Sequence, residues 1–150
     1  MALRWIVFGS PEYREVVELR RRVLRIPLGL DFTPDQLAGE GKDLHLAAYE
    51  TGALVGCLML SDHGGGVVQM RQVCVEPNRQ GTGVGALLVR ESEAEARRRG
   101  YRHMMLHARD IAVGFYERMG YEKVGEPFVE VSIPHQEMNK DLQTPGPQMG

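Results

Sequence analysis

The order of apolar and polar residues along the first half of the chain predicts a strand and two helices. Arg4 to Phe8 is rich in β-branched and aromatic residues, which is typical of a strand. Ser10 followed by Pro11 is a typical helix start. This helix should run to about Arg25, because it carries an apolar stripe of Val16, Val17, Leu19, Val23 and Leu24. A capping box at Thr33 to Gln36 predicts a short second helix.

Three apolar runs then predict three consecutive strands. Leu44 to Tyr49 and Ala53 to Leu60 are separated by Glu50-Thr51-Gly52, which is a hairpin signal. A loose turn from Asp62 to Gly66 leads into the third strand, Val67 to Val75. Strands joined by such short turns pair antiparallel, so this part of the chain should form an antiparallel meander.

The pattern changes after the meander. A glycine-rich segment, Gln80 to Ala86, opens a helix that should run to about Arg99 and end at Gly100. His103 to Ala108 has the composition of a strand. Because this strand follows a helical crossover, it should pair parallel to an earlier strand.

The last elements are shorter. Asp110 should cap a helix that Gly120 ends, with one face made of Ala112, Phe115, Tyr116 and Met119. Glu122 to Val124 and Val131 to Leu142 are the last strand candidates, although Pro134 interrupts the second.

Residues Thr144 to Gly150 are rich in Pro, Gly and Gln and should form a disordered tail. With neither an internal repeat nor a linker in the sequence, we expect one domain over residues 1–143. Its fold class should be α/β (α+β), with a mixed, mostly antiparallel sheet flanked by helices and one parallel strand pair.

Composition and charge narrow the class of partner. The 150 residues carry a formal net charge of −2, so no overall basic field favours nucleic acid or a membrane surface. Arg20–Arg22 and Arg97–Arg99 fall late in predicted helices, where cations complement the helix dipole, and we interpret both runs as solvated faces. Cys57 and Cys74 lie in apolar runs, which predicts buried, reduced thiols and an intracellular, cytoplasmic protein. The sequence holds no apolar run long enough to span a membrane.

The glycine-rich segment is the first candidate for a binding site. Its glycines alternate with other residues, so successive backbone N–H groups are left uncovered. At a helix N-terminus such donors add to the positive end of the helix dipole and suit a phosphate or pyrophosphate. A flexible turn is the alternative for this segment taken alone.

Two other phosphate-binding motifs fit less well. Gly81, Gly83 and Ala86 satisfy the dinucleotide fingerprint G-x-G-x-x-G/A. That fingerprint belongs in the first short turn of a parallel sheet, whereas a hairpin meander comes first here. The strand after the helix also ends in His107-Ala108-Arg109, where a ribose-binding carboxylate is needed. A Walker loop is excluded, because no Gly-Lys-Ser/Thr follows.

Two motifs in order resemble the GNAT (GCN5-related) N-acetyltransferase superfamily. The first is a strand, then Q/R-x-x-G-x-G/A, then a helix, matched by Gln80, Gly83 and Gly85. The second, Ala112 to Tyr121, is similar to A-x-x-F/L-Y-x-x-x-G-F/Y. The resemblance spans Val67 to about Leu142. Two further segments, Val23-Leu24…Pro27-Leu28-Gly29 and Ile133-Pro134-His135 followed by Met138, resemble the ElaA-like and YjcF-like subgroup.

The resemblance implies acetyl-CoA as the donor. The loop would hold its pyrophosphate through residues Gln80, Gly81, Thr82, Gly83, Val84, Gly85 and Ala86. Main-chain groups of the preceding strand would pair with pantetheine where the fourth and fifth strands splay apart, and they belong to Val73, Cys74 and Val75. Arg109 stands where many relatives have an asparagine, and it is either a contact to a CoA phosphate or to the pantetheine edge, or a surface residue.

The resemblance also implies direct transfer to a primary amine of a small molecule or peptide. Tyr116 matches the general acid that protonates the departing thiolate, and its alternative role is that of a buried aromatic. A strand amide such as that of Val75 could bond the thioester oxygen. The general base stays open between His107, His135 and a water chain, and either histidine could instead be structural. Glu76 precedes Pro77 and should lie at the strand end, so it is not assigned as the base.

The sequence also bears on a nucleophilic cysteine, a metal site, a dimer and a non-catalytic function. Cys74 has no His/Asp partner pattern that would make it a nucleophile, and packing against pantetheine suits it better. The scattered histidines have no metal spacing, so no metal is expected. Many relatives dimerise through late strands, which makes a homodimer a further expectation. A non-catalytic acyl-CoA-binding or regulatory module is the alternative to an enzyme.

Overall fold

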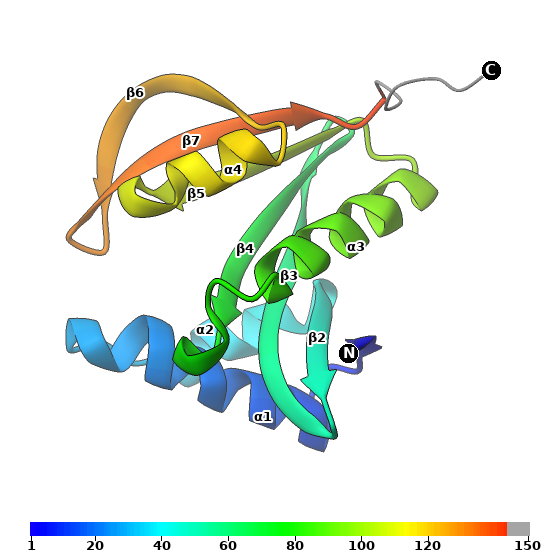
Figure 1. The fold of residues 1–150 in the computed structure, drawn as a ribbon, viewed down its shortest axis with the longest axis vertical. Coiled ribbons are helices and arrows are strands. Elements are labelled where there is room, and N and C mark those ends of the chain that lie inside the picture. Colours follow the sequence, from blue (N-terminus) through cyan, green and yellow to red (C-terminus); the bar gives the residue numbers. More distant parts are fainter. Residues whose placement is uncertain (144–150) are drawn as a thin grey trace. The chain divides into compact units, whose positions relative to one another are not determined.

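A seven-stranded sheet organises residues 1–143, the part of the chain that a computed structural model describes (Figure 1). The strands follow the order β1-β2-β3-β4-β5-β7-β6, mostly antiparallel, with β4 and β5 parallel. Their bounds are β1 Ala2–Ile6, β2 Leu44–Glu50, β3 Ala53–Gly64, β4 Val67–Val75, β5 His103–Arg109, β6 Glu122–Glu130 and β7 Ile133–Asp141. The mixed sheet with one parallel pair confirms the predicted fold class.

Helical segments connect the strands. The α-helices are α1 Pro11–Arg20, α2 Pro34–Ala38, α3 Val84–Arg98 and α4 Val113–Arg118. A π-helical turn, η1, continues α1, and the other short segments are 3₁₀ turns: η1 Arg21–Arg25, η2 Ile26–Leu28, η3 Gly39–Lys42, η4 Pro77–Arg79 and η5 Asp110–Ala112. Among the described residues no helix is long and apolar enough to cross a membrane.

The chain gathers into two compact units, which we describe separately. The first comprises Met1–Ser61 and Met70–Ser92, and the second comprises Asp62–Gln69 and the residues from Glu93 onward. The expectation of one domain stays a prediction, and the predicted disordered tail lies outside the described residues.

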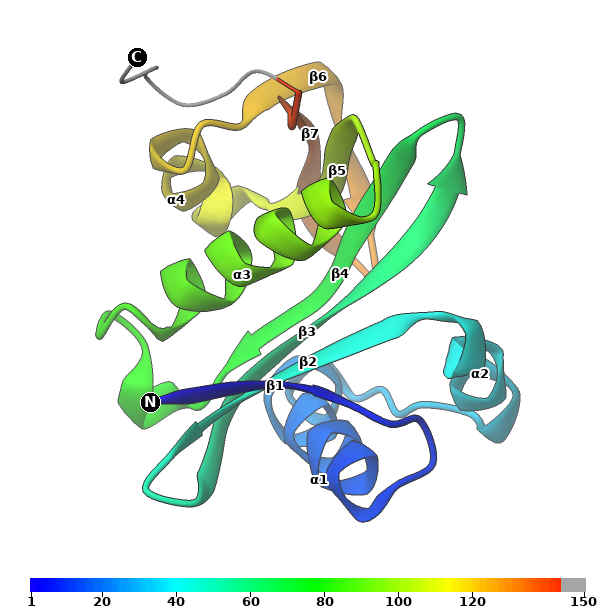
Figure 2. The ribbon, with the colours of Figure 1, turned by 90° about the vertical axis from the view of Figure 1, so that its right-hand side faces the viewer.

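In the first unit, α1 covers one face of the antiparallel strands (Figure 2). Val16 and Leu19 of α1 pack on Ala47 and Tyr49 of β2, together with Cys57 and Cys74. The helix begins as predicted, because the Ser10 side chain accepts a hydrogen bond from the Tyr13 amide. The capping box of α2 is confirmed in both of its hydrogen bonds, Thr33 N–H to Gln36 and Gln36 N–H to Thr33.

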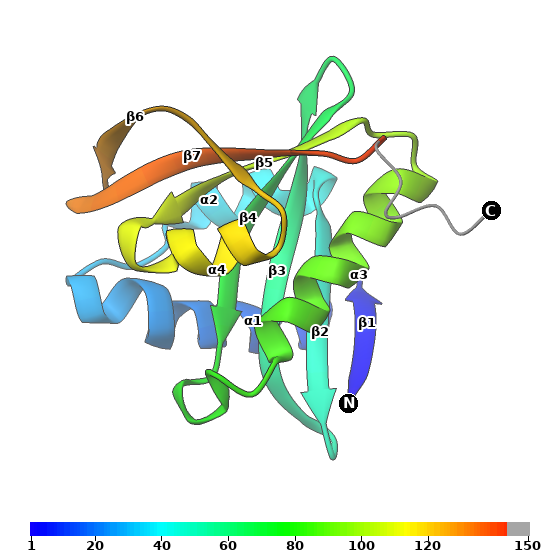
Figure 3. The same ribbon diagram turned by 45° about the horizontal axis from the view of Figure 1, so that its top comes forward.

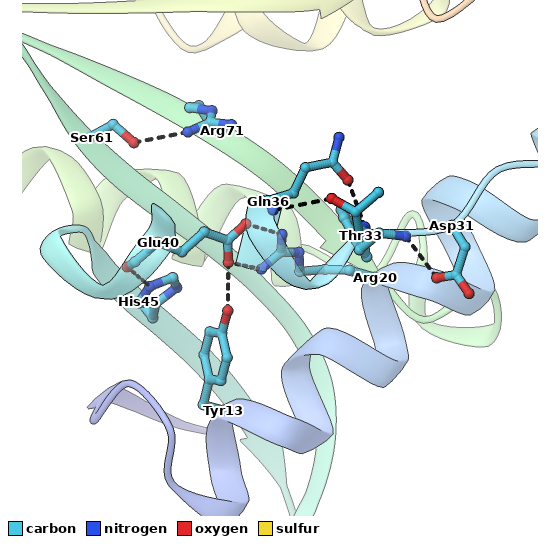
Figure 4. Close-up of polar contacts among 10 residues, drawn as sticks. Tyr13, Arg20, Asp31, Thr33, Gln36, Glu40, His45, Ser61 and Arg71 are labelled. Atoms are coloured by element: carbon cyan, nitrogen blue, oxygen red, sulfur yellow. Dashed lines mark hydrogen bonds and ion pairs between the residues drawn. The ribbon is translucent and has the colours of Figure 1, made fainter. Parts of the chain in front are cut away.

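The same unit holds a buried polar cluster around Glu40 (Figure 4). Arg20 Nη1 and Nη2 donate to the two Glu40 oxygens at 2.8 and 2.6 Å, and the Tyr13 hydroxyl donates to Oε1 at 2.8 Å. His45 Nε2 donates to the Glu40 carbonyl at 2.9 Å. The cluster ties α1 to the segment after α2. Arg20 is only 1% exposed, so the prediction of a solvated face for Arg20–Arg22 was wrong at its first residue.

In the second unit, β6 and β7 form a hairpin next to β5 (Figure 3). The sequence predicted β6 only as Glu122 to Val124, and it runs to Glu130. Its partner β7 begins at Ile133, so the connection is the two-residue turn Val131-Ser132, with φ values of 45° and 65°. These values are typical of a type I′ turn, which the sequence does not signal because Asn and Gly are absent.

Two smaller predictions also differ from the structure. The first strand is Ala2–Ile6 rather than Arg4 to Phe8, since β1 stops where β2 begins, with Ile6 opposite His45. Asp110 does not cap α4. It lies in the 3₁₀ turn η5, where its Oδ1 accepts from the next amide, Ile111. Helix α4 begins at Val113, and its N-cap residue is Ala112, which makes no side-chain cap hydrogen bond.

Candidate active site

The glycine loop between β4 and α3 lies in the first unit, at the carboxyl end of β4 (Figure 3). Gly81 and Gly83 have φ values of 81° and 95°, the left-handed region in which other residues are strained. A side-chain carbon built at either glycine would meet nothing within 4 Å. Nothing therefore covers the backbone at these two glycines, although the Thr82 amide between them already donates to the Arg79 carbonyl at 3.3 Å.

The polar side chains of this loop bond back to the main chain before it. Gln80 Nε2 donates to the Val75 carbonyl at 3.2 Å, and Thr82 Oγ1 donates to the Arg79 carbonyl. These bonds fix the loop from one side. The first helical bond of α3 runs from the Leu87 amide to the Gly83 carbonyl at 3.1 Å. The amides of Val84, Gly85 and Ala86 belong to the first turn, whose N–H groups have no acceptor within the helix.

Close packing holds the start of α3 in place. A carbon added to Gly56 of β3 would lie 3.0 Å from Leu88 and 3.1 Å from both Val84 and the Cys74 carbonyl. Only glycine lets the helix come this near to the strand. The positive end of the helix dipole is thereby fixed beside β3 and β4 within the first unit.

The end of β4 carries the three residues that the resemblance assigns to pantetheine. Gln72, just before them, has a φ of 54° inside the strand, which is typical of a β-bulge and which no sequence feature signalled. Val73 and Val75 are half-buried and Cys74 is buried. A hydrogen bond with Cys74 and burial together raise the pKa of the Cys57 thiol, and both cysteines are free. The predicted burial of both thiols is confirmed.

Glu76, which we left unassigned, pairs with an arginine. Arg22 Nη1 and Nη2 lie 3.2 and 3.3 Å from its two carboxylate oxygens. A carboxylate engaged in this way is poorly placed to accept a proton from a substrate. The residues of β4 before it include no other carboxylate.

Tyr116 lies in the second unit, on α4. It is 6% exposed, and its ring meets those of Phe115 and Tyr121 edge to face, at 5.0 and 5.7 Å between centroids. Burial raises the pKa of Tyr116 above its ordinary value of 10.0. The phenol is therefore protonated at neutral pH, as a proton donor must be.

A second polar network anchors the end of the helix that carries Tyr116. The Tyr121 hydroxyl donates to Glu93 Oε2 at 2.8 Å, and Lys140 Nζ lies 3.0 Å from Oε1 of the same carboxylate. Lys140 also donates to the Met119 carbonyl at 2.8 Å. One lysine from β7 thus satisfies the C-terminal turn of α4 and a buried carboxylate of α3.

The structure brings both candidate histidines to one place in the second unit. His107 Nδ1 lies 3.2 Å from Glu130 Oε1, and His135 Nε2 lies 3.7 Å from Glu130 Oε2. The Phe128 ring meets His107 edge to face at 5.0 Å and stacks on His135 at 6.0 Å. We call these four residues the imidazole–carboxylate cluster. Sequence reasoning missed Glu130 and Phe128, because their approach depends on the unpredicted β6–β7 hairpin.

Arg109, the departure from the family pattern, ends β5 and is half-buried. Its Cα lies opposite that of His135 in the pairing of β5 with β7. Cross-strand partners project from the same face of a sheet. Arg109 is therefore on the face of the imidazole–carboxylate cluster. Within residues 1–143, no three histidine, cysteine or acidic side chains gather so as to hold a metal ion.

The sequence and the fold match known proteins. Residues 32–142 match the family model described as an acetyltransferase (GNAT) domain, which is more than half of the chain. The uncharacterised N-acetyltransferase YjcF of Bacillus subtilis is 30% identical over 111 residues, which are 71% of this chain and 75% of that protein. Against four curated relatives, the chain spans between 53% and 75% of their length.

Solved structures share the fold. A putative N-acetyltransferase from Lactobacillus plantarum has a TM-score of 0.81 and 26% identity, covering 95% of this chain and 99% of that chain. An aminoglycoside 6'-N-acetyltransferase complexed with coenzyme A has a TM-score of 0.79 and 18% identity, covering 99% and 100%. At that identity the likeness to the second structure concerns the fold alone.

Proposed function

The chain belongs to the GNAT acetyltransferase family, and on that premise we propose that it transfers an acetyl group from acetyl-CoA to a primary amine. The observation that carries the proposal is the glycine loop, with Gly81 and Gly83 left-handed and uncovered at the start of a helix. Backbone donors at a helix N-terminus suit a diphosphate. A structure of the same fold was solved with coenzyme A, which supports the choice of ligand.

The donor would be held mainly by the backbone. The amides of Gly81 and of Gly83 to Ala86 would take the pyrophosphate. Gln80 and Thr82 would fix the loop by their bonds to the preceding main chain, which include that of the Thr82 amide. The main-chain groups of Val73, Cys74 and Val75 would pair with pantetheine as an added strand does. Arg109 would approach a phosphate or the pantetheine edge.

The transfer needs no covalent enzyme intermediate. The neutral amine attacks the thioester carbon, the carbonyl oxygen takes negative charge, and the Val75 amide would stabilise it. When the intermediate collapses the C–S bond breaks, and the leaving thiolate takes the proton of Tyr116. As Tyr116 gives up this proton, its oxygen takes the extra proton from the substituted nitrogen, so Tyr116 ends as it began.

The pKa of Tyr116 sets a condition on this step. A thiol has an ordinary pKa near 8.5 and a free tyrosine near 10, and burial raises the pKa of Tyr116 further. Donation to an isolated thiolate is therefore unfavourable. Transfer becomes favourable when the positively charged nitrogen of the intermediate returns a proton to the same oxygen in concert.

The test is thiol release from acetyl-CoA over a panel of primary amines. Tyr116→Phe should lower kcat by about 100-fold, the lower end of what general acid catalysis contributes, and should leave the KM for acetyl-CoA near that of the wild type. Tyr101→Phe, a half-buried tyrosine outside the candidate site, is the matched control and should keep full activity. Full retention by Tyr116→Phe would contradict the general acid role.

A non-catalytic acyl-CoA-binding module is the second candidate. One observation favours it, because β4 offers no carboxylate base and Glu76 is paired with Arg22. Calorimetry decides between the two. Binding of acetyl-CoA with no turnover of any amine favours the module, and absence of binding contradicts both candidates.

A further inference from the structure

The imidazole–carboxylate cluster leaves hydrogen-bond acceptors without a donor between them. His135 Nδ1 lies 2.8 Å from the Ile133 carbonyl, which can only accept, so Nδ1 carries the proton of the neutral ring. The lone pair is then on Nε2. That nitrogen faces Glu130 Oε2 at 3.7 Å, beyond hydrogen-bond distance. Two acceptors therefore face each other across a gap.

His107 differs from His135, because it donates a hydrogen bond to the other oxygen of Glu130. Its Nδ1 lies 3.2 Å from Glu130 Oε1, so an ionised Glu130 fixes the proton on Nδ1 and leaves the His107 Nε2 lone pair free. Glu130 is 46% exposed at its side chain whereas His135 is only 6% exposed. The gap is thus open on the carboxylate side and closed behind the ring of His135.

The surrounding charges favour a cation. Cross-strand register places Glu137 opposite His107 and Arg109 opposite His135, on the same face as the cluster. Among the residues beside the two histidines, the carboxylates of Glu130 and Glu137 stand against the guanidinium of Arg109 when both imidazoles are neutral. Farther along the same face, the register adds the carboxylates of Glu122 and Asp141. Phe128 adds an aromatic wall between the two imidazoles, and such a ring attracts cations to its face.

The cluster lies next to the segment that leads to Tyr116. The turn η5 connects β5 to α4 and contacts both β5 and β7. Side chains alternate along strands, and Lys140 bonds the end of α4 from one face of β7. His135 lies an odd number of positions from Lys140, so it projects from the opposite face, which α4 leaves uncovered.

We propose that Glu130 and His135 bind the protonated primary amine of the acceptor, and that His135 Nε2 removes its proton. This rests on the proposed function. An ammonium nitrogen on the open side of the gap, off the line that joins the two acceptors, can lie about 2.8 Å from both. One N–H bond breaks, its electron pair stays on nitrogen, and the proton moves to Nε2. The imidazolium is then paired with Glu130, the neutral amine is ready to attack, and His135 later releases the proton to water. The acceptor class is accordingly a cationic amine.

Steady-state kinetics tests this assignment, with the amine varied at saturating acetyl-CoA and acetyl-CoA varied at saturating amine. Glu130→Gln keeps the shape of the side chain and removes its charge, so the KM for the amine should rise by about 10-fold or more while the KM for acetyl-CoA is unchanged. Glu126→Gln, an exposed change on the same strand, is the control and should leave both constants unchanged. In His135→Gln the acid limb of the kcat/KM profile for the amine should disappear, which a structural role alone would not cause.

A binding measurement keeps the test independent of turnover. In the wild-type protein, n-butylammonium should shift the imidazole NMR signals of His107 and His135, whereas 1-butanol, of the same shape without charge, should not. Glu130→Gln should abolish the shift. Turnover with a wild-type amine KM in Glu130→Gln overturns this inference and leaves the proposed function standing. If no amine is turned over, imidazole shifts with n-butylammonium but not with 1-butanol still support the cation site. The absence of such shifts overturns it.

Discussion

Two carboxylates, Glu40 in the first unit and Glu130 in the second, each bring together groups from distant parts of the chain, but with opposite results. Glu40 is 5% exposed, and both of its oxygens are bonded, by a bidentate arginine and by the Tyr13 hydroxyl. Glu130 is half exposed and holds one imidazole at 3.2 Å and faces the other at 3.7 Å. Both oxygens of Glu40 therefore accept strong hydrogen bonds, whereas Glu130 can still accept hydrogen bonds from a ligand.

This difference separates a structural polar group from a binding one. A buried charge is costly unless it is paired and hydrogen-bonded, so Glu40 leaves no room for a ligand. A half-exposed carboxylate keeps part of its hydration and can exchange that water for a cation. Polar clusters in this fold can therefore be sorted by the acceptors that remain unbonded rather than by their number of charges.

The largest effect should come from breaking the Glu40 cluster. Arg20→Met leaves the Glu40 charge buried, and among the described residues Tyr13 is then the one remaining side-chain donor to it. We expect a loss of about 3–5 kcal/mol in the free energy of unfolding. Urea unfolding measures it. Arg99→Met is the matched control, because Arg99 is half exposed and pairs with Glu95 on the helix surface, and it should cost about 0.5 kcal/mol or less.

The double variant Arg20→Met/Glu40→Leu sharpens this prediction. It removes both charges, so it should be markedly more stable than Arg20→Met alone. If Arg20→Met is as stable as Arg99→Met, then Glu40 does not depend on Arg20, and the description of Glu40 as a buried, fully bonded carboxylate is wrong. Glu130→Gln should leave the unfolding free energy nearly unchanged, because it strands no buried charge.

The two carboxylates should also differ in their effect on acid stability. Burial raises the pKa of Glu40, but the hydrogen bonds and charge of Arg20 outweigh burial and hold the pKa below its ordinary value of 4.5. A lowered folded-state pKa adds stability above the unfolded value, and this stability is lost as the pH falls through the folded value. Unfolding followed from pH 7 into the range below 4.5 should show this loss in the wild type.

Measuring stability against pH in two variants tests whether Glu40 causes this loss. Arg20→Met/Glu40→Leu should lose less stability on acidification than the wild type, because it has no carboxylate to protonate there. Glu130→Gln should follow the wild type. Equal acid dependence in the wild type and the double variant would show that other carboxylates control this range.

Local sequence allowed prediction of one half of the candidate site. The glycine loop needs only its own left-handed glycines and the helix behind them, and Tyr116 follows at a fixed spacing in a short motif. The hairpin between β2 and β3 was also predictable, because its turn, Thr51-Gly52, places glycine at a φ of 83°. Each of these features is set by residues close together in the chain.

The other half depends on contacts between distant residues. Arg20 looked like one of three surface arginines, and its burial depends on Glu40, twenty residues away. Glu130 lies five residues before His135, but they meet only because a two-residue turn sets the register of β6 and β7. Nothing in Val131-Ser132 signals that turn. The acceptor side therefore could not be assembled from the sequence.

The smallest predicted effect concerns this turn. It tests whether Val131-Ser132 only sets the register of β6 and β7 or also contacts the acceptor. Val131 and Ser132 have φ values of 45° and 65°, which are strained for a β-branched residue. Val131→Asn/Ser132→Gly supplies the residues that a type I′ turn favours and should raise the unfolding free energy by about 1 kcal/mol. Val129→Asn, on the exposed strand before the turn, should bring no gain. Because the new turn keeps the register that places Glu130 near His135, the KM for the amine should not change. A higher KM would mean that the Val131 side chain itself contacts the acceptor, and the site would then extend beyond the imidazole–carboxylate cluster.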